Sequence, residues 1–316
     1  MSASSVLVSG AAGFIGRAVT LHLAASRHEV VVALRRPRDI PGASRQVDAG
    51  DLAAPDPALA NAMRGVAAVV HAAGLAHRTG VDPTAMASAN VTAARRVAEI
   101  AASRGVPRFV LVSSAAVFGK SRPDPFSESS IVGPDDPYAR SKLDGERAVR
   151  DALAGSATSL VIIRPCAVVG PGCAGNIPRL IQLIESRWPL PFGRIRNKRS
   201  FIDVDDLAAL IGRTINAKEV PDILIAAHEQ PISTPDLIRA LMRGLSRRRA
   251  LLPVPERVLQ AGATAAGKAS LWQSFAGSFQ ADVSLTARTL GYRAPTSVEN
   301  ALQRTAAAIR YNNTAD

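Results

Sequence analysis

The chain has 316 residues and a mass of 33.0 kDa, which suits one large α/β unit or two smaller domains. Hydrophobic residues make up 47% and charged residues 20%, so a substantial core can form and global disorder is excluded. The 38 lysines and arginines exceed the 26 acidic residues, and the formal net charge is +12. This charge favours an anionic partner but does not distinguish nucleic acid, a membrane surface and a phosphorylated metabolite.

The cysteine count and the apolar runs indicate a cellular location. Cys166 and Cys173 are too few for a disulfide scaffold and lack the paired spacing of a zinc site, so we expect no bound metal. No apolar run reaches the roughly 18–20 residues that span a bilayer. The N-terminus has no basic segment of the signal-peptide kind. We therefore expect a cytoplasmic protein that does not insert into membranes.

Short apolar runs alternate with amphipathic segments in the first half of the chain. Strands are predicted over residues 6–9, 30–34, 67–71, 109–113 and 160–163. Helices are predicted from the first glycines to about residue 25, over about 84–104 and over about 138–155. Continuous apolar strands separated by such helices indicate a parallel sheet covered on both faces. Because crossovers are right-handed, the sheet is doubly wound, which is a Rossmann fold.

The composition changes after Arg164-Pro165. Prolines and glycines crowd residues 165–193, which predicts loop and short helix in place of regular βα repeats. A helix over about 204–217 and a strand over about 223–226 are then expected to return to the sheet, and the chain from 234 onwards is expected to be mostly helical.

These features predict two regions of unequal size. Residues 1–165 are expected to form a dinucleotide-binding domain to which residues 199–230 return. Residues 166–316 are expected to supply a smaller, mostly helical lobe for the substrate.

Three glycines follow the first predicted strand and open the first predicted helix. In such a turn Gly10 permits the sharp bend, Gly13 lets backbone N–H groups approach a pyrophosphate, and Gly16 lets helix and sheet pack closely. The helix N-terminus stabilises the anion. This context favours dinucleotide binding over a glycine-rich turn without a ligand.

The end of the second predicted strand bears on the choice of cofactor. An NAD site places an acidic residue about 20 residues after the glycines, where it accepts from the ribose 2′-hydroxyl. Here the strand ends in Arg35 and Arg36, which offer charge-assisted hydrogen bonds to a 2′-phosphate. The sequence favours NADP, with NAD as the alternative, unless both arginines are only solvated surface residues.

Tyr138 and Lys142 lie four residues apart at the start of a predicted helix and therefore share one face. A free tyrosine titrates near ~10, but a nearby ammonium and a helix N-terminus both favour the phenolate, which suits a general acid/base. Ser114 follows the strand that ends at residue 113, and its hydroxyl can bridge a reacting oxygen and the tyrosine. We predict that these three residues are catalytic.

Together these motifs resemble the extended short-chain dehydrogenase/reductases, in their nucleotide-sugar epimerase/dehydratase branch, over nearly the whole chain. The motifs are Gly10-x-x-Gly13-Phe-Ile-Gly16, Asp51-Leu52, His71-Ala-Ala-Gly74, Ser113-Ser114, Phe118-Gly119, Tyr138-x-x-x-Lys142 and Arg164-Pro165.

The resemblance implies that Asp51 and Leu52 contact the adenine and that Lys142 holds the nicotinamide ribose. Ala72, Ala73 and Gly74 would line the cofactor channel. The expected cofactor-binding residues are Gly10, Gly13, Phe14, Ile15, Gly16, Arg35, Arg36, Asp51, Leu52, Ala72, Ala73, Gly74, Ser113, Tyr138, Lys142 and Pro165.

The resemblance also implies a nucleotide-sugar substrate, of UDP type, bound by the second half. Asn176 would contact the nucleotide sugar, and Arg199 would bind the diphosphate, for which a guanidinium is well shaped. Asn90 is a weaker assignment, since a helix-capping or packing role fits it equally. A homodimer through the helices at 84–104 and 138–155 is the family expectation.

Three reactions of the branch compete. Dehydration needs extra acid/base groups after the serine, where this chain has Ala115 and Ala116. A 4-keto reductase and a 4-epimerase need the same three catalytic groups. The two arginines after the second strand favour the reductase, and the run 189–200 is similar to a subgroup that includes reductases of UDP-linked 4-keto-6-deoxy-N-acetyl sugars. Phe118 stands where the family often has tyrosine, so a hydroxyl near the sugar is lost, and Val169 replaces a common aromatic residue. Both departures leave the sugar open.

Two other classes fit less well. A non-catalytic dinucleotide sensor typically loses the tyrosine or the lysine, and this chain keeps both. Nucleic-acid binding would rest on the charge and on the run 247–249, which has no interleaved aromatic residues to stack on bases. We interpret that run as a solvated helix end and expect no nucleic-acid partner.

Overall fold

The computed structural model describes residues 4–314 except 55, 77–81, 120 and 187. Its centre is a fully parallel seven-stranded sheet with the strand order β3-β2-β1-β4-β5-β6-β9. The strands are β1 (Ser5–Ser9), β2 (Glu29–Leu34), β3 (Arg45–Asp48), β4 (Ala68–His71), β5 (Arg108–Val112), β6 (Ser159–Pro165) and β9 (Ile223–Ala226). The order reverses between β1 and β4, which is where doubly wound sheets bind their ligands. The predicted Rossmann fold is confirmed.

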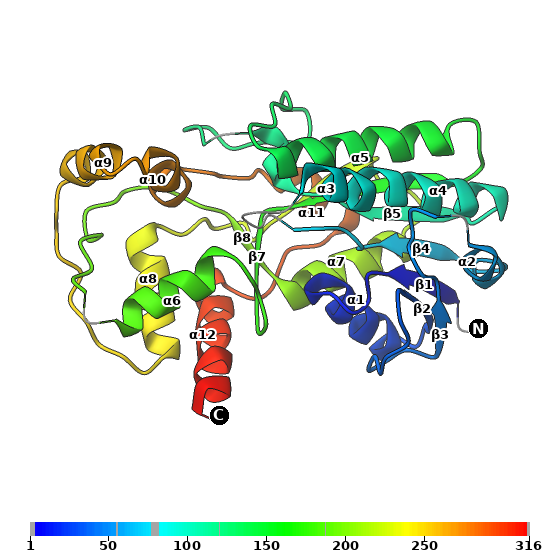
Figure 1. Ribbon diagram of the computed structural model, residues 1–316, viewed down its shortest axis with the longest axis horizontal. Helices are drawn as coiled ribbons and strands as arrows, with labels where there is room; N and C mark the ends of the chain where they lie inside the picture. Colours follow the sequence, from blue (N-terminus) through cyan, green and yellow to red (C-terminus); the bar gives the residue numbers. More distant parts are fainter. Residues whose placement is uncertain (1–3, 55, 77–81, 120, 187, 315–316) are drawn as a thin grey trace.

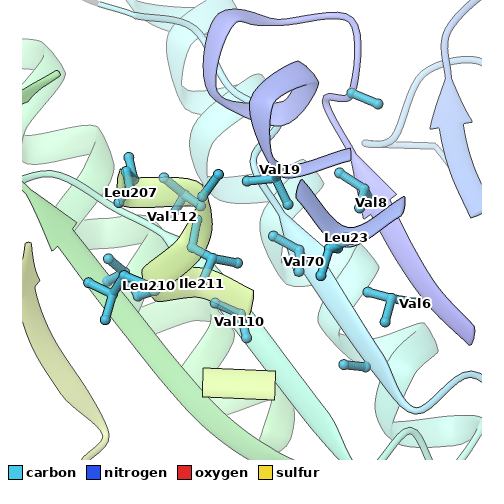
Figure 2. Packing of buried hydrophobic residues seen from close by; sticks show 14 of the residues in the cluster. Val6, Val8, Val19, Leu23, Val70, Val110, Val112, Leu207, Leu210 and Ile211 are labelled. Atoms are coloured by element: carbon cyan, nitrogen blue, oxygen red, sulfur yellow. The ribbon is translucent and has the colours of Figure 1, made fainter. Parts of the chain in front are cut away.

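One face of the sheet is covered by α1 (Phe14–Ala25) and α7 (Val204–Asn216). Figure 2 shows Val19 and Leu23 of α1 and Leu207 of α7 lying over the valines of the central strands. All three side chains are fully buried, and each fully buried aliphatic side chain contributes about 1.5–3 kcal/mol. The strands read as continuous apolar runs because both of their faces are covered.

The other face carries α2 (Pro57–Ala62), α4 (Ala93–Ser103) and α5 (Pro137–Leu153), with α4 and α5 side by side in Figure 1. The start of α5 is set by the sequence Asp136-Pro137: the aspartate side chain accepts from Ala139 N at 2.8 Å, and proline occupies the first helical position. This start places Tyr138 in the first turn of the helix.

The predicted helix over 84–104 is wrong as a single element. The segment is divided into α3 (Pro83–Ala87), a π-helical turn η1 (Ser88–Thr92) and α4. The wide turn points the Asn90 side chain inward, where it accepts from Leu75 N at 2.8 Å and donates to Ser141 Oγ at 2.9 Å. π turns of this kind occur mostly as single-turn insertions within α-helices and are frequent at functional sites.

β3 and α2 are among the short elements that escaped the sequence analysis. β3 has four residues, of which only Val47 is buried, so it shows no apolar run. α2 has six residues, too few for a helical period. β3 pairs with β2, and α2 packs against β3; local sequence does not report such contacts.

The second half of the chain forms a helical portion beside the sheet, on the left of Figure 1. Its core lies between α6 (Asn176–Glu185), α8 (Thr234–Gly244) and α12 (Val298–Thr314). A separate parallel pair joins β7 (Ala167–Val169) to β8 (Phe201–Asp203). The remaining helices are α9 (Glu256–Ala265), α10 (Ala269–Ala276) and α11 (Ser284–Leu290).

Among the residues that the structure describes, no helix has both the length and the apolar character needed to cross a membrane.

The packing of α5 on η1 predicts opposite effects for alanine at two helical glycines. A Cβ on Gly145 would lie 2.3 Å from the backbone oxygen of Asn90, whereas a Cβ on Gly262 of α9 would meet nothing within 4 Å. Gly145→Ala should therefore lower the free energy of unfolding by about 1–3 kcal/mol. Gly262→Ala should raise it by roughly 0.5–1 kcal/mol, because alanine is the better helix former. Urea unfolding of both variants checks the signs, and a stabilised Gly145→Ala would contradict the packing.

Candidate active site

The glycine turn after β1 lies against the loop that follows β4. Gly10 has a φ of +78°, and a Cβ there would lie 2.5 Å from the backbone nitrogen of Ala73. A Cβ on Gly16 would lie 2.1 Å from the backbone oxygen of Gly10. Only glycine satisfies both positions, so the turn and the segment Ala72–Gly74 form one continuous wall at the carboxyl edge of the sheet.

The N-terminus of α1 fits the pyrophosphate of a dinucleotide. Its N-cap, Gly13, has no side-chain cap, and the first turn contains no acidic residue. The uncapped amides and the helix dipole are therefore available to an anion. Phe14 and Ile15 follow directly: Ile15 packs on the sheet core, and Phe14 packs on the core of the helical portion. The start of α1 thus touches both parts of the molecule.

The residues predicted to hold the adenosine half lie at the ends of β2 and β3. Arg35 and Arg36 are exposed directly after β2. Asp51 is exposed and accepts from Ala53 N at 3.1 Å, while Leu52 is half-buried against the core below it.

The three residues predicted to be catalytic converge at the ends of β5 and α5. Tyr138 and Ser114 share a side-chain hydrogen bond. Ser114 also caps η2 (Ala115–Phe118), a 3₁₀ turn, by accepting from Ala116 N at 3.2 Å. Lys142 Nζ donates to the backbone oxygen of Val112 at 2.6 Å.

Burial dominates the titration of these groups. Burial raises the pKa of Tyr138 and the carboxylate of Asp136 adds to this, while the hydrogen bond with Ser114 opposes it. The expected shift towards the phenolate is therefore wrong, because burial moves the pKa of Tyr138 in the opposite direction. Burial also lowers the pKa of Lys142 to about 8, against the attraction of Glu146. Tyr138 is thus a protonated acid, and Lys142 is a cation that readily gives up its proton.

A buried histidine lies beneath this group. Burial, and then the charge of Lys142, lower the pKa of His71 to about 3, so the imidazole is neutral. Its Nδ1 shares a 2.8 Å hydrogen bond with Ser9 Oγ, and its Nε2 has no partner among the described residues.

The sequence analysis did not single out Glu146. It is buried, accepts from Ser113 Oγ and forms an ion pair with Arg164 at 2.6 Å. The signal was present, since Tyr138, Lys142 and Glu146 follow one another at four-residue spacing. Asn90, for which capping and packing were left open, packs: it ties Leu75 to α5.

The two residues predicted to bind substrate belong to the helical portion. Asn176 is exposed at the first position of α6. Arg199 is half-buried, its backbone pairs with Ile232 in both directions at 2.9 Å, and its guanidinium donates to the backbone oxygen of Gly277 at 3.3 Å. Burial lowers its pKa, and the buried Cys166 thiol beside it follows Pro165 at the end of β6. Arg199 therefore approaches the carboxyl edge of the sheet.

The basic run at 247–249 is only partly solvated, so its interpretation as a solvated helix end is wrong for one residue. Arg247 and Arg248 are exposed. Arg249 instead donates to the backbone oxygens of Ile184, at 2.9 Å, and Ser186 at the end of α6. It stabilises carbonyl groups that have no partner within that helix.

In the described part of the chain, no group of three or more side chains that could hold a metal ion lies together.

The fold and this site define a class of dinucleotide-dependent enzymes, and comparison with known proteins gives the family. The chain belongs to the NAD dependent epimerase/dehydratase family, whose pattern matches residues 6–226. It is 29% identical to UDP-glucose 4-epimerase of Vibrio cholerae, over 98% of this chain and 96% of that protein. The resemblance to extended nucleotide-sugar enzymes is confirmed, and this protein is an NAD-dependent-family enzyme that acts on nucleotide sugars.

Solved structures agree with this assignment. MoeE5 in complex with UDP-glucuronic acid and NAD is 26% identical, with a TM-score of 0.77 over 98% of this chain and all of that chain. TunA, an NAD dependent NDP-hexosamine 5,6-dehydratase, is 25% identical, with a TM-score of 0.78 over 99% of this chain and all of that chain.

Because the ammonium of Lys142 is buried, we expect this residue to lower the free energy of unfolding at neutral pH. Because its pKa in the folded chain lies below the unfolded value of 10.5, the native state binds the proton less tightly than the unfolded state. Lys142→Met should therefore raise the free energy of unfolding at pH 7, by about 1–3 kcal/mol. The difference in free energy of unfolding between the variant and the parent should shrink as the pH rises from about 8 towards 10.5. In this window Lys142 is neutral in the folded chain but still charged in the unfolded chain, so the parent gains stability.

Urea unfolding of both proteins at neutral pH and near the upper end of that window checks the sign, with Lys218→Met as a control away from this site. A variant less stable than the parent at neutral pH would contradict the effect of burial.

Proposed function

We propose that this enzyme reduces the C4 keto group of a UDP-linked 4-keto-6-deoxy (N-acetyl) sugar, with NADPH as the reductant. The proposal is carried by one observation: at the carboxyl edge of the sheet, Tyr138 and Ser114 share a hydrogen bond and Lys142 bonds to Val112, two residues before Ser114. The same edge holds the glycine turn that fits a dinucleotide.

Side chains of this protein bind the reacting oxygen and transfer the proton to it. A bound nicotinamide dinucleotide supplies the hydride that forms the new C–H bond. Tyr138, protonated because it is buried, donates its proton to the carbonyl oxygen, so that the C=O double bond becomes C–OH. Ser114 donates a hydrogen bond that orients this oxygen. Lys142 then stabilises the tyrosinate by its charge, and its lowered pKa suits it to pass on a proton.

The helical portion is proposed to bind the nucleotide diphosphate. Arg199 has the planar donor set that matches phosphate oxygens, and its position near the end of β6 supports this role. Asn176 lies exposed at the start of α6, a position that supports contact with the nucleotide sugar.

The end of β2 supports the reductase. Arg35 and Arg36 are exposed there, and no carboxylate stands at these positions to accept from a ribose 2′-hydroxyl. A reductase that consumes its reductant draws on NADPH. Dehydration is disfavoured, because Ala115 and Ala116 in η2 cannot transfer a proton.

A second candidate is a UDP-sugar 4-epimerase that keeps NAD bound. The full-length similarity to UDP-glucose 4-epimerase supports it, as does the NAD in the MoeE5 complex. An epimerase returns the hydride to the same carbon, so the catalytic groups of this chain serve it equally. The cofactor separates the two candidates.

Tyr138→Phe removes the acid and leaves the ring. We expect kcat for a UDP-4-keto-6-deoxy-N-acetylhexosamine to fall by about 10²–10⁴-fold, with cofactor affinity unchanged. NADPH oxidation with this sugar, and fluorescence titration of the cofactor, measure the two effects. Tyr311→Phe, at an exposed tyrosine on α12, is the matched control and should keep full turnover. Undiminished turnover of Tyr138→Phe would overturn its role.

Arg35→Ala tests the cofactor. It should weaken NADPH binding by about 10-fold, because a charge-assisted hydrogen bond is lost, and leave NADH binding nearly unchanged. Arg45→Ala, at the first residue of β3 and away from the end of β2, should change neither. Mass spectrometry of the dinucleotide released from the denatured protein completes the test. Retained NAD⁺, with equal effects of Arg35→Ala on both cofactors, would favour the epimerase.

A further inference from the structure

The helix α5 reaches the end of β5 with three polar side chains spaced four residues apart. Lys142 binds the backbone oxygen of Val112, Glu146 accepts from the hydroxyl of Ser113, and Tyr138 bonds to Ser114. Three successive residues, Val112 to Ser114, thus each bond to one of three successive turns of α5, although the order along the helix differs from the order along the strand. Such a ladder fixes how far the helix can slide or rotate relative to the strand.

Glu146 is the member of this ladder that touches neither the proposed substrate site nor solvent. Its side chain is 1% exposed and that of Arg164 is 4% exposed. Arg164 Nε donates to Oε1 of Glu146 at 3.0 Å, and Nη2 donates to Oε2 at 2.6 Å, which makes a bidentate ion pair. Since Ser113 also donates to Oε1, the carboxylate receives three hydrogen bonds.

The Glu146–Arg164 ion pair contacts residues on both sides of Ser114 in the chain. On one side Glu146 holds the hydroxyl of Ser113. On the other side the Arg164 guanidinium lies 5.0 Å from the centre of the Phe118 ring, at the end of the turn that Ser114 caps. Ser114 therefore lies between two contacts of one buried ion pair.

We propose that Glu146, held by Arg164, is a positioning residue that sets Ser114 and Lys142 in register with Tyr138. A stabilising role alone does not require these residues, because apolar side chains of similar volume often replace a buried ion pair without loss of stability. What the pair adds is directional contact with Ser113 and a negative charge behind Lys142. The catalytic consequence rests on the proposed function, whereas the register and the charge do not.

The negative charge of Glu146 affects a measurable quantity, the pKa of Lys142, that a purely packing role would leave unchanged. Lys142 is faced by Glu146 from its own helix, by His71 from β4, and by the backbone oxygen of Val112 from β5. Tyr138 lies one turn earlier on the same face of the helix. Among the titratable groups, Glu146 raises the pKa of Lys142 against the effect of burial. Glu146→Gln keeps the shape and removes the charge, so the pKa of Lys142 should fall.

Lysine NMR provides the test on the intact chain. The sequence has only five lysines, so protein labelled with ¹³C-lysine gives five ε-CH₂ signals, and Lys142→Arg identifies the relevant one. In Glu146→Gln the Lys142 titration should move down by about 0.5–1 pH unit. With the keto sugar, kcat should fall by about 10–100-fold, while KM and cofactor affinity stay within about 3-fold.

Two further variants separate positioning from folding. Asp203→Asn removes another buried carboxylate, which pairs with Arg304 at 2.6 Å far along the chain. It should lower the melting temperature comparably and leave the Lys142 titration in place. Glu146→Gln combined with Arg164→Met removes the uncompensated arginine charge, and it keeps the test open if the single variant does not fold.

The outcomes are distinct. A Lys142 titration in folded Glu146→Gln, or in the double variant, that overlays the parent curve would overturn the proposal, and so would a full kcat. A parent enzyme inactive on keto sugars and on UDP-hexoses would contradict the proposed function. In that case the Lys142 titration still decides the inference.

Discussion

The anchoring of α5 on the end of β5 is the constraint on which the rest of the site depends. A helix that covers a sheet is usually held by apolar contacts, which tolerate small slides and rotations. Here Lys142 and Glu146 bind fixed atoms of Val112 and Ser113, and these bonds have direction as well as strength. Ser114 and Tyr138 meet because the residues before and after them are held in this way.

The same arrangement makes the site costly for the fold. Lys142 holds its proton against burial, and the buried Nε2 of His71 has no hydrogen-bond partner among the described residues. Both features cost stability, whereas burial itself favours the neutral form of His71 and the protonated form of Tyr138. Such a trade-off is common at active sites, where stabilising substitutions tend to remove function.

The helical portion is joined to the sheet through the first turn of α7. Asp203 pairs with Arg304 of α12, and Asp206 accepts from Thr296 through both backbone and side chain. The Tyr292 hydroxyl donates to the backbone oxygen of Asp206 at 2.7 Å. These bonds tie a helix on the sheet to the C-terminal segment, so the proposed substrate residues keep a fixed relation to the catalytic ones.

The sequence by itself determined the parallel sheet, the glycine turn and the placement of Tyr138 and Lys142 on one face of a helix. These features rest on local periods and on residues with special backbone freedom, such as Gly10. It also indicated the family, which the comparisons bear out. Only the tertiary structure decided the π turn at Asn90, the ion pair of Glu146 with Arg164, and the raised pKa of Tyr138. These depend on which groups far apart in the chain become buried together, and burial is a property of the packed fold that no local pattern contains.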